Sequence, residues 1–322
     1  MRDEARFAFH DLAPGEESFR DAVLHGLARP QKAIPCKFFY DERGSALFEQ
    51  ICRLPEYYPT GTEIAILEEN AEEIAAQMGV YSRIVEFGSG ASHKARILLQ
   101  ALDRPVAYVP VDISREHLLE AASSLAEDFP DTAIIAVCAD YTRPFSLPPL
   151  PGPAGKRIGF FPGSTIGNFE PDAAVRFLAN CADILGSRGE MLIGVDLKKD
   201  PSILDAAYND RRGVTAAFNL NLFERINREL DADLDLDLFE HFAFYSESKG
   251  RVEIYIRSLV DQQAMIAGRR FQFGAGELIH TEYSYKYSVA EFRALAARAG
   301  FRPVDTWTDS AELFSVHYFR LH

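Results

Sequence analysis

The stretch Ile84-Val85-Glu86-Phe87-Gly88-Ser89-Gly90-Ala91-Ser92 decides the fold of this chain. Its first four residues form an apolar run, interrupted only by Glu86, of the kind that forms a buried strand. Gly88 and Gly90 allow the backbone to turn tightly beside a ligand, and residues 95–102 then have the pattern of a helix. A strand, a glycine turn and a helix in this order predict a binding site for a nucleotide-type cofactor.

The details of the turn indicate which cofactor it binds. The dinucleotide fingerprint is G-x-G-x-x-G, and here His93 occupies the third glycine position. Glu86 precedes the first glycine and can pair with a cationic, amino-acid-like ligand. We therefore expect S-adenosylmethionine rather than a dinucleotide, with Glu86, Gly88, Ser89 and Gly90 at the cofactor.

Two further apolar strands end in acidic residues. Residues 106–112 end in Asp112, about 24 residues after the first glycine, where a ribose-binding acid is expected. Residues 134–139 are followed by Asp140 and Tyr141, a polar and aromatic pair suited to an adenine. Each acid alone could be an ordinary strand-end or helix-capping residue. Three strands that end in acids at helix-separated spacing are a more specific signal for a cofactor site.

The composition excludes several classes of protein. The 322 residues are 47% hydrophobic and carry a net charge of -14, so phosphate-rich nucleic acid is disfavoured as a partner. No apolar run approaches the roughly 18 residues of a membrane span, and the charged start of the chain is unlike a signal peptide. The cysteines at 36, 52, 138 and 181 form no C-x-x-C pair. We expect a cytoplasmic monomer without a metal.

The pattern around these strands predicts how the chain is divided. Strands alternating with helices continue through residues 158–195, which predicts a mostly parallel sheet with helices on both faces. Residues 30–69 are rich in Pro, Gly and aromatic side chains, and we expect ligand-facing loops there. From residue 197 to about residue 282 the alternation stops. A helix over 213–230 and paired strands over 239–245 and 252–259 indicate an inserted module.

The alternation resumes near the C-terminus. Ser288 and Glu291 form a capping box for a helix that Gly300 ends, and strands over 301–307 and 313–319 follow. An antiparallel last strand is the usual end of a methyltransferase sheet. We expect a class I S-adenosylmethionine-dependent methyltransferase (Rossmann-like) α/β domain with an inserted α+β substrate-binding domain. The predicted divisions are 1–60 and 197–285 for the substrate domain, and 61–196 and 286–322 for the methyltransferase core.

Six motifs carry a resemblance that covers nearly the whole chain. They resemble those of the L-histidine Nα-methyltransferases of ergothioneine biosynthesis, and the resemblance implies trimethylation of free L-histidine to hercynine with three S-adenosylmethionine molecules. It also implies a substrate domain built from the N-terminal segment and the insertion. The motifs are Lys37-Phe38-Phe39-Tyr40-Asp41, Leu54-Pro55-Glu56-Tyr57-Tyr58-Pro59-Thr60, Glu86-Phe87-Gly88-Ser89-Gly90, Phe161-Pro162-Gly163-Ser164-Thr165-Ile166-Gly167-Asn168-Phe169, Ala217-Phe218-Asn219-Leu220-Asn221 and His280-Thr281-Glu282-Tyr283-Ser284.

The resemblance assigns roles to individual residues. Asn168 and Tyr208 match the pair that holds the carboxylate and amine end of the substrate, and Tyr40 matches the aromatic residue beside the amine. We expect these three to act in catalysis. Tyr57 or Tyr58 matches a tyrosine near the imidazole, with Tyr57 preferred. The remaining assignments are Glu282 and Ser284 at the imidazole, Gly163 at the substrate, and Lys94 at the cofactor together with Asp112, Asp140 and Tyr141.

Strand periodicity agrees with part of this assignment, because positions 282 and 284 of one strand point to the same face. One position departs from the family pattern. Ile254 stands where the family often has methionine in the ring pocket, which keeps an apolar wall and leaves the discrimination between side chains open.

Three alternatives belong to other classes or substrates. A short-chain dehydrogenase would use Tyr245 and Lys249, which have Y-x-x-x-K spacing, yet Gly250 and two flanking strand patterns would separate them. A non-catalytic cofactor-binding protein is the second alternative. The third is a methyltransferase for another aromatic amino acid, such as tryptophan or tyrosine. Glu282 together with Ser284 favours imidazole over indole, because indole has no second nitrogen.

Overall fold

The computed structural model describes residues 7–12, 18–90, 93–152 and 155–321. The chain divides into two compact units. The first takes the described residues of Met1–Gly15, Thr62–Leu197 and Tyr287–His322, and the second takes those of Glu16–Gly61 and Lys198–Lys286. Ala91 and Ser92, the last two residues of the stretch that predicts the fold, lie outside the described residues.

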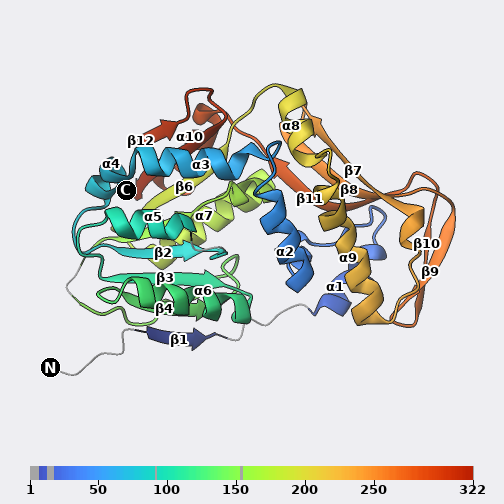
Figure 1. Ribbon diagram of the computed structural model, residues 1–322, viewed down its shortest axis with the longest axis horizontal. Helices are drawn as coiled ribbons and strands as arrows, with labels where there is room; N and C mark the ends of the chain where they lie inside the picture. The colour runs from blue at the N-terminus through green and yellow to red at the C-terminus, as the bar shows by residue number, and fades with distance from the viewer. Residues whose placement is uncertain (1–6, 13–17, 91–92, 153–154, 322) are drawn as a thin grey trace. The chain divides into compact units, whose positions relative to one another are not determined.

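An eight-stranded sheet forms the centre of the first unit (Figure 1). The first six strands in the sheet order are parallel, and β13 is antiparallel to both of its neighbours, which confirms the predicted methyltransferase-like ending. The order is β1 (Phe7–Asp11), β4 (Ala133–Cys138), β3 (Ala107–Asp112), β2 (Arg83–Phe87), β5 (Arg157–Phe161), β6 (Glu190–Asp196), β13 (Phe314–Leu321) and β12 (Phe301–Thr308).

The chain order of these strands locates the ligand-binding edge. β2, β3 and β4 follow one another in one direction across the sheet, and β5 and β6 lie in the other direction. The switch point therefore falls between β2 and β5. Open α/β sheets bind ligands there, outside the carboxyl ends of the strands.

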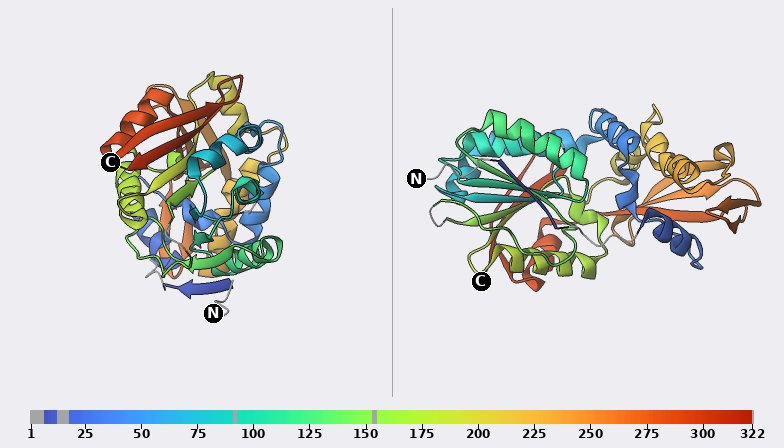
Figure 2. Two further views of the ribbon diagram at one scale, coloured as in Figure 1. Left: turned by 90° about the vertical axis from the view of Figure 1, so that its left-hand side faces the viewer. Right: turned by 90° about the horizontal axis from the view of Figure 1, so that it is seen from below.

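Helices cover both faces of this sheet. Figure 2 shows the teal and green helices α5 and α6 on one face, and the yellow-green α7 and orange-red α10 on the other. Ser288 caps α10 through the predicted capping box with Glu291. The helices of the first unit are α4 (Ala71–Met78), α5 (His93–Ala101), α6 (Arg115–Asp128), η2 (Thr165–Asn168), α7 (Pro171–Leu185) and α10 (Val289–Arg298), and α3 (Tyr58–Glu69) spans the boundary.

A three-stranded antiparallel sheet is the centre of the second unit. Between two of its strands, the chain forms a separate two-stranded hairpin. The three strands are β11 (Leu278–Tyr285), β8 (Arg251–Ser258) and β7 (Phe239–Ser246), and the hairpin is β9 (Gln262–Ile266) and β10 (Arg269–Phe273). The helices are α1 (Phe19–Leu27), η1 (Cys36–Phe39), α2 (Glu42–Ile51), α8 (Pro201–Tyr208), α9 (Val214–Leu230) and η3 (Leu236–Leu238).

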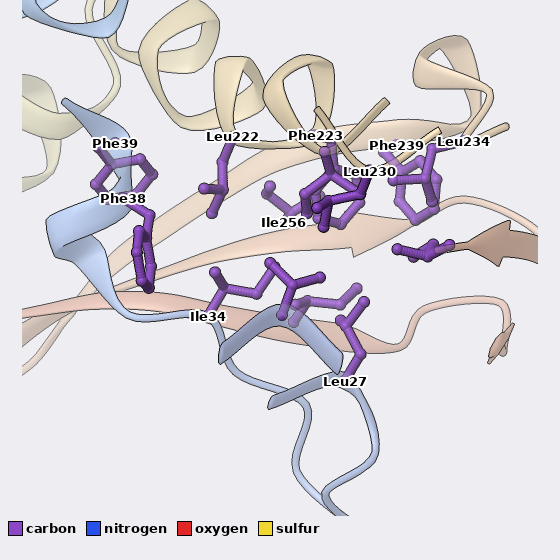
Figure 3. Close-up of a cluster of buried hydrophobic side chains, with 14 of the residues drawn as sticks. Leu27, Ile34, Phe38, Phe39, Leu222, Phe223, Leu230, Leu234, Phe239 and Ile256 are labelled. Atoms are coloured by element: carbon purple, nitrogen blue, oxygen red, sulfur yellow. The ribbon is translucent and has the colours of Figure 1, made fainter. Parts of the chain in front are cut away.

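One hydrophobic core joins the two sequence segments of the second unit. Phe38 and Phe39 of the N-terminal segment pack with Leu222 and Phe223 of α9 and with Ile256 of β8 (Figure 3). Burying a side chain of this size stabilises the fold by roughly 1.5–3 kcal/mol relative to exposure. Residues far apart in the sequence therefore fold as one body.

Two expectations from the sequence were wrong. Residues 1–60 were assigned to the substrate domain, yet Phe7–Asp11 forms β1 at the edge of the large sheet, in parallel register with β4. Five residues give too short a pattern to be recognised as a strand. Residues 30–69 were expected to be loops, but most of them form η1, α2 and α3.

The glycine and proline residues that suggested loops fit helices for local reasons. Asp41 caps α2 by accepting a hydrogen bond from the backbone N–H of Gly44. A Cβ at Gly44 would lie 1.8 Å from the carbonyl oxygen of Phe39, so glycine is needed for close approach rather than for a turn. Pro59 occupies the first turn of α3, where a helix needs no N–H donor.

No helix in the described part of the chain is long and apolar enough to cross a membrane.

Candidate active site

The carboxyl ends of four neighbouring strands carry most of the residues predicted to bind the cofactor, together with Gly163, which is predicted to bind the substrate. Glu86 lies in β2, Asp112 ends β3, Asp140 follows β4 and Gly163 follows β5. Parallel strands end at the same edge of a sheet, so these residues share one edge of the first unit. β2 and β5 flank the switch point, which is where this sheet is expected to bind a ligand.

Glu86 is a buried carboxyl group with few compensating charges. Its side chain accepts a hydrogen bond from the hydroxyl of Tyr108, and that hydroxyl lies 3.4 Å from Ser89 Oγ. Burial raises the pKa of Glu86 to about 7, although the Tyr108 hydrogen bond and the charge of Lys94 oppose the rise. A cationic group placed beside Glu86 would stabilise its ionised form.

The glycine turn lies against the aromatic residue that follows β4. Gly88 has a φ of 77°, which favours glycine, and a Cβ there would lie 3.3 Å from the hydroxyl oxygen of Tyr141. The Tyr141 ring packs edge-on against Phe161 and Phe177. The structure thus brings Gly88 and Tyr141 together, two cofactor residues predicted from separate strands.

The other two acids at the sheet edge are held by local hydrogen bonds. Asp112 Oδ1 accepts from the backbone N–H of Ser114 at 2.8 Å, and burial raises the pKa of Asp112 to about 6 despite that bond. Asp140 accepts from the backbone and hydroxyl of Thr142 and forms an ion pair with Arg143 at 3.3 Å.

Glu63, which no sequence motif predicts as a site residue, connects two predicted site residues of the first unit. Its buried carboxylate accepts from Lys94 Nζ and from the backbone N–H of Gly163. A Cβ at Gly194 would lie 2.0 Å from Glu63 Oε1, so the carboxylate fits only because β6 has glycine there. Lys94 and Gly163 are brought together, and Asn168 ends the short helix η2 that follows Gly163.

In the second unit, several predicted substrate residues form one cluster. The rings of Tyr57 and Tyr208 meet edge-on, with centroids 6.2 Å apart. Burial raises the pKa of Tyr57 well above its ordinary value, and the nearby Tyr208, Tyr40 and Glu282 raise it further. Burial raises the pKa of the neighbouring Cys36 thiol to about 12, and Glu282 adds to that rise. Four of the predicted substrate residues therefore lie close together.

Glu282 and Ser284 follow a bulge in β11. The register shifts between His280 and Glu282, and beyond the shift Glu282 pairs with Ile254 and Ser284 with Val252. Ile254 and Val252 belong to an apolar cluster that includes Tyr208 and is contacted by Tyr57. A carboxylate and a hydroxyl therefore sit at alternate positions of a strand whose neighbour supplies an apolar wall.

Tyr208 and Ser284 share a buried hydrogen-bond network with Lys286. The Tyr208 hydroxyl donates to Ser284 Oγ at 2.9 Å, and Lys286 Nζ donates to both oxygens, also at 2.9 Å. No sequence motif predicts a role for Lys286. Its position two residues after Ser284 is a signal that strand periodicity could have used.

Two asparagines of α9, Asn219 and Asn221, form hydrogen bonds with residues that neighbour this cluster. Asn219 Nδ2 donates to the carbonyl of Tyr255 at 2.8 Å and lies 2.9 Å from His241 Nδ1. Since an amide N–H must donate, His241 Nδ1 accepts, and Nε2 donates to the backbone carbonyl of Tyr208 at 2.9 Å. Burial lowers the pKa of His241, in agreement with a neutral ring.

Asn221 supports the other end of the cluster. Its Nδ2 donates to Asp41 Oδ1 at 2.8 Å, and Asp41 also pairs with Arg228 at 2.6 Å. Asp41 directly follows Tyr40, whose ring packs edge-on against Phe48 and is 43% exposed. The motif on α9 thus fixes the backbone beside two predicted catalytic tyrosines.

The two adjacent tyrosines of α3 and the loop before it have different partners. The Tyr58 hydroxyl accepts from Lys199 Nζ at 2.5 Å, and that ammonium lies 4.3 Å from the Tyr58 ring centroid. The Tyr57 ring instead packs edge-on against Tyr208, and the charge of Glu282 contributes to the raised pKa of Tyr57. Both tyrosines pack against the apolar cluster that contains Ile254 and Tyr208, and the edge-on contact with the Tyr208 ring favours Tyr57 as the residue near the substrate ring.

The parallel sheet with an antiparallel last strand, the glycine turn and the strand-end acids define a class I S-adenosylmethionine-dependent methyltransferase. The second unit adds a cluster of aromatic, carboxylate and hydroxyl groups to that fold. The chain belongs to the family of histidine-specific, SAM-dependent methyltransferases, which matches residues 19–321.

Curated relatives agree with this family. Histidine N-alpha-methyltransferase of Mycolicibacterium smegmatis is 41% identical over 305 residues, which cover 93% of this chain and 94% of the relative. Its counterpart in Mycobacterium tuberculosis is 38% identical, with 94% of each chain covered. Ergothioneine biosynthesis protein 1 of Neurospora crassa is 33% identical across 89% of this chain, which corresponds to 33% of that longer protein.

Proposed function

We propose that this protein transfers three methyl groups from S-adenosylmethionine to the α-amine of free L-histidine and forms hercynine, the first step of ergothioneine biosynthesis. The family and the names of its relatives support the reaction. The observation that carries the substrate assignment is the arrangement on β11. Glu282 and Ser284 lie at alternate positions of the strand, with Ile254 paired to Glu282 across the sheet.

The residues of the first unit fit S-adenosylmethionine. Glu86 is a buried carboxyl with a raised pKa, so a cationic ligand beside it would stabilise its ionised form. Gly88 has a positive φ, and its lack of a side chain lets the backbone approach a ligand closely. We propose that Glu86, Ser89, Gly90 and Lys94 bind the amino-acid end of the cofactor, with Asp112 at the ribose and Asp140 and Tyr141 at the adenine. When bound, the cofactor supplies an electrophilic methyl group.

The residues of the second unit suit the imidazole of histidine. The Glu282 carboxylate can accept from one ring N–H, and the Ser284 hydroxyl is placed two residues along the same strand. Ile254 supplies an apolar surface, and Tyr57 completes it with an aromatic ring. An acceptor and a hydroxyl beside an apolar wall match a ring with two nitrogens better than indole or phenol.

The remaining residues orient the reacting amine. We propose that Asn168 and Gly163 bind the substrate carboxylate, that Tyr208 contacts the amine end, and that the Tyr40 ring stabilises the quaternary ammonium product through its π face. Amide and phenol groups can form these hydrogen bonds while they themselves stay uncharged. Holding the amine in line with the methyl group can lower the barrier by roughly 7–11 kcal/mol.

One incubation tests the reaction and the substrate together. The protein is mixed with S-adenosylmethionine and each of histidine, tryptophan, tyrosine and phenylalanine, and the products are analysed by mass spectrometry. We expect histidine alone to gain methyl groups, up to three. A gain on tryptophan or tyrosine with none on histidine would replace the proposed substrate, and no gain on any of them would contradict the proposed reaction.

We also propose that the protein acts as a monomer in the cytoplasm. Its four cysteines are all free thiols, in keeping with a reducing compartment. Sedimentation equilibrium of the purified protein, with and without S-adenosylmethionine and histidine, tests the monomer. A mass that corresponds to a dimer at micromolar concentration would contradict it.

A further inference from the structure

Lys286 is among the most completely buried side chains of the second unit. It is 2% exposed, and it directly follows β11. Burying an ammonium is costly unless it is hydrogen-bonded. Lys286 Nζ donates to Tyr208 Oη and Ser284 Oγ, at 2.9 Å in each case, and lies 4.9 Å from the centroid of the Tyr208 ring. The charge is thus placed against two predicted substrate residues.

The three groups form a closed triangle with a defined polarity. A lysine ammonium can only donate, whereas a serine hydroxyl has one proton and two acceptor lone pairs. Ser284 Oγ accepts from Lys286 Nζ and also from the Tyr208 hydroxyl. Both of its lone pairs are used inside the triangle, so the serine proton is what it offers to a ligand.

We propose that Lys286 fixes Ser284 as a hydrogen-bond donor and that the site thereby selects the neutral imidazole ring of its substrate. This inference rests on the proposed function. Glu282, two residues earlier on β11, is the acceptor, so the strand presents one acceptor and one donor. Neutral imidazole has one N–H and one bare nitrogen, which match this pair, whereas imidazolium has two N–H groups. The second N–H of imidazolium would meet an oxygen without an available lone pair.

The charged groups on the neighbouring elements have other partners. On β8, Glu253 pairs with Lys249 at 2.7 Å and with Arg251 at 3.0 Å. On α8, Asp205 accepts from the backbone N–H of Tyr245 at 2.7 Å. The backbone N–H of Lys286 donates to the carbonyl of Gly250, where Lys198 also lies, and Tyr57 packs against Tyr208. None of these contacts is removed by a substitution that changes only the Lys286 ammonium.

Lys286→Met tests the inference, because methionine has a similar length and no donor. Histidine binding is measured by calorimetry from pH 5.5 to 8 for the wild type and the variant, both saturated with S-adenosylhomocysteine. In the wild type we expect the affinity to fall about tenfold per unit below the imidazole pKa of about 6.5. In Lys286→Met the serine regains a lone pair for imidazolium, so we expect a fall of less than about threefold per unit. The ratio of the two dissociation constants at each pH cancels titrations elsewhere in the protein.

Two further variants separate polarity from folding. Ser284→Ala removes the hydroxyl that would donate to neutral imidazole and leaves the lysine in place. Because alanine offers imidazolium no acceptor, we expect the pH profile to flatten only in part, to a fall between those of the wild type and Lys286→Met. Lys286→Arg keeps a donor, and we expect it to retain the wild-type profile. Lys249→Met removes a partly exposed ammonium of the same unit and should leave the pH profile unchanged.

The outcomes distinguish this inference from the proposed function. Wild-type protein that neither binds nor methylates histidine at pH 8 contradicts the function itself. Binding by the wild type, with a constant ratio of dissociation constants for Lys286→Met at every pH, overturns only the role of Lys286. If Lys286→Met does not fold, as judged by circular dichroism, Ser284→Ala decides alone, and an unchanged profile in that variant overturns the inference.

Discussion

The two units hold their functional side chains by different physical means. In the first unit, Glu86 is a buried and Asp112 a partly buried carboxyl at a strand end, and loss of hydration is the main reason that their pKa values are raised to about 7 and about 6. In the second unit, Tyr208, Ser284 and Lys286 satisfy one another through hydrogen bonds. The first arrangement is suited to a ligand that brings charge. The second arrangement is suited to a ligand whose own donors and acceptors match those of the protein.

The largest expected effect is on the stability of the first unit. It concerns Glu63, which differs from Glu86 and Asp112 because it already has a charged partner. Glu63 is a buried carboxylate that is already paired, with Lys94 and the Gly163 N–H. Breaking a buried ion pair on one side typically costs about 3–5 kcal/mol. We expect Glu63→Gln to lower the free energy of unfolding by about 3 kcal/mol in urea denaturation, and to weaken S-adenosylmethionine binding because Lys94 loses its anchor.

A double substitution separates charge from packing. In Glu63→Gln combined with Lys94→Met, no unpaired charge remains, so we expect a good part of the lost stability to return. If Glu63→Gln is as stable as the wild type, the pair does not hold the cofactor edge of the sheet. Equal stability of the single and double variants would show that the unpaired lysine is not the cause.

The next largest effect is expected for catalysis, at Glu282 of the second unit, the proposed hydrogen-bond acceptor for the imidazole ring of histidine. Glu282→Gln keeps the size of the side chain and removes the charge that strengthens a hydrogen bond, a loss of about 1.5–3 kcal/mol. We expect kcat/KM for histidine to fall by roughly 10- to 100-fold. Steady-state kinetics with S-adenosylmethionine at saturation measures it.

Glu240→Gln is the matched control for that measurement. Glu240 lies on β7 and pairs with Arg257 at the surface, where both side chains are more than a third exposed. Exposed ion pairs contribute little, about 0–1 kcal/mol. We expect Glu240→Gln to change kcat/KM for histidine by less than about twofold. A similar loss in both variants would indicate a general effect of charge on the unit and not ring recognition by Glu282.

The raised pKa of Glu86 predicts how cofactor binding depends on pH. Below a pKa of about 7 the carboxyl is protonated and neutral, so it no longer attracts a cationic ligand. We expect the dissociation constant of S-adenosylmethionine to rise up to about tenfold per unit as the pH falls below 7. Asp112, with a pKa of about 6, adds to the loss only below pH 6. Calorimetric titration between pH 5.5 and 8.5 measures it.

Glu86→Gln is the variant that checks the assignment. It has no proton to lose, so we expect weaker binding at pH 8 and a nearly flat profile between pH 6 and 8. The unliganded protein should show the opposite trend in stability. A carboxyl whose pKa is raised in the folded state destabilises the fold as the pH rises from about 4.5 towards 7. A wild-type profile retained in Glu86→Gln would assign the titration to another group.

The fold of the first unit could be predicted from the sequence because it follows from local order along the chain. Strand, glycine turn and helix are adjacent in sequence, and parallel strands bring their ends to one edge. Glu63 could not be predicted from such local order. It belongs to a helix before β2, and its partners Lys94 and Gly163 come from separate segments, so only the three-dimensional structure joins them.

The second unit was predicted less completely because its contacts are long-range. The resemblance supplied its site residues, but no local pattern placed Phe38 and Phe39 against α9 or made residues 30–69 helical. Lys286 is the instructive omission. Lysine is almost never fully buried without partners, so the sequence favours a solvent-facing position. The hydroxyls that bury it, on Tyr208 and Ser284, come from different elements.

The smallest expected effect on kcat/KM concerns two neighbouring tyrosines, Tyr57 and Tyr58. The sequence alone does not show which of them lies near the substrate ring. The Tyr57 ring packs edge-on against Tyr208, whereas the Tyr58 hydroxyl accepts a hydrogen bond from Lys199. A neutral hydrogen bond contributes about 0.5–1.5 kcal/mol, so we expect Tyr57→Phe to lower kcat/KM for histidine by about three- to tenfold. Tyr58→Phe should change it by less than about twofold, since its hydroxyl serves a lysine rather than the substrate. Both substitutions keep the ring and remove one oxygen, so each is the control for the other. A larger loss in Tyr58→Phe would move the ring contact to the first residue of α3 and would mean that the cluster around Tyr208 is organised by packing and not by substrate recognition.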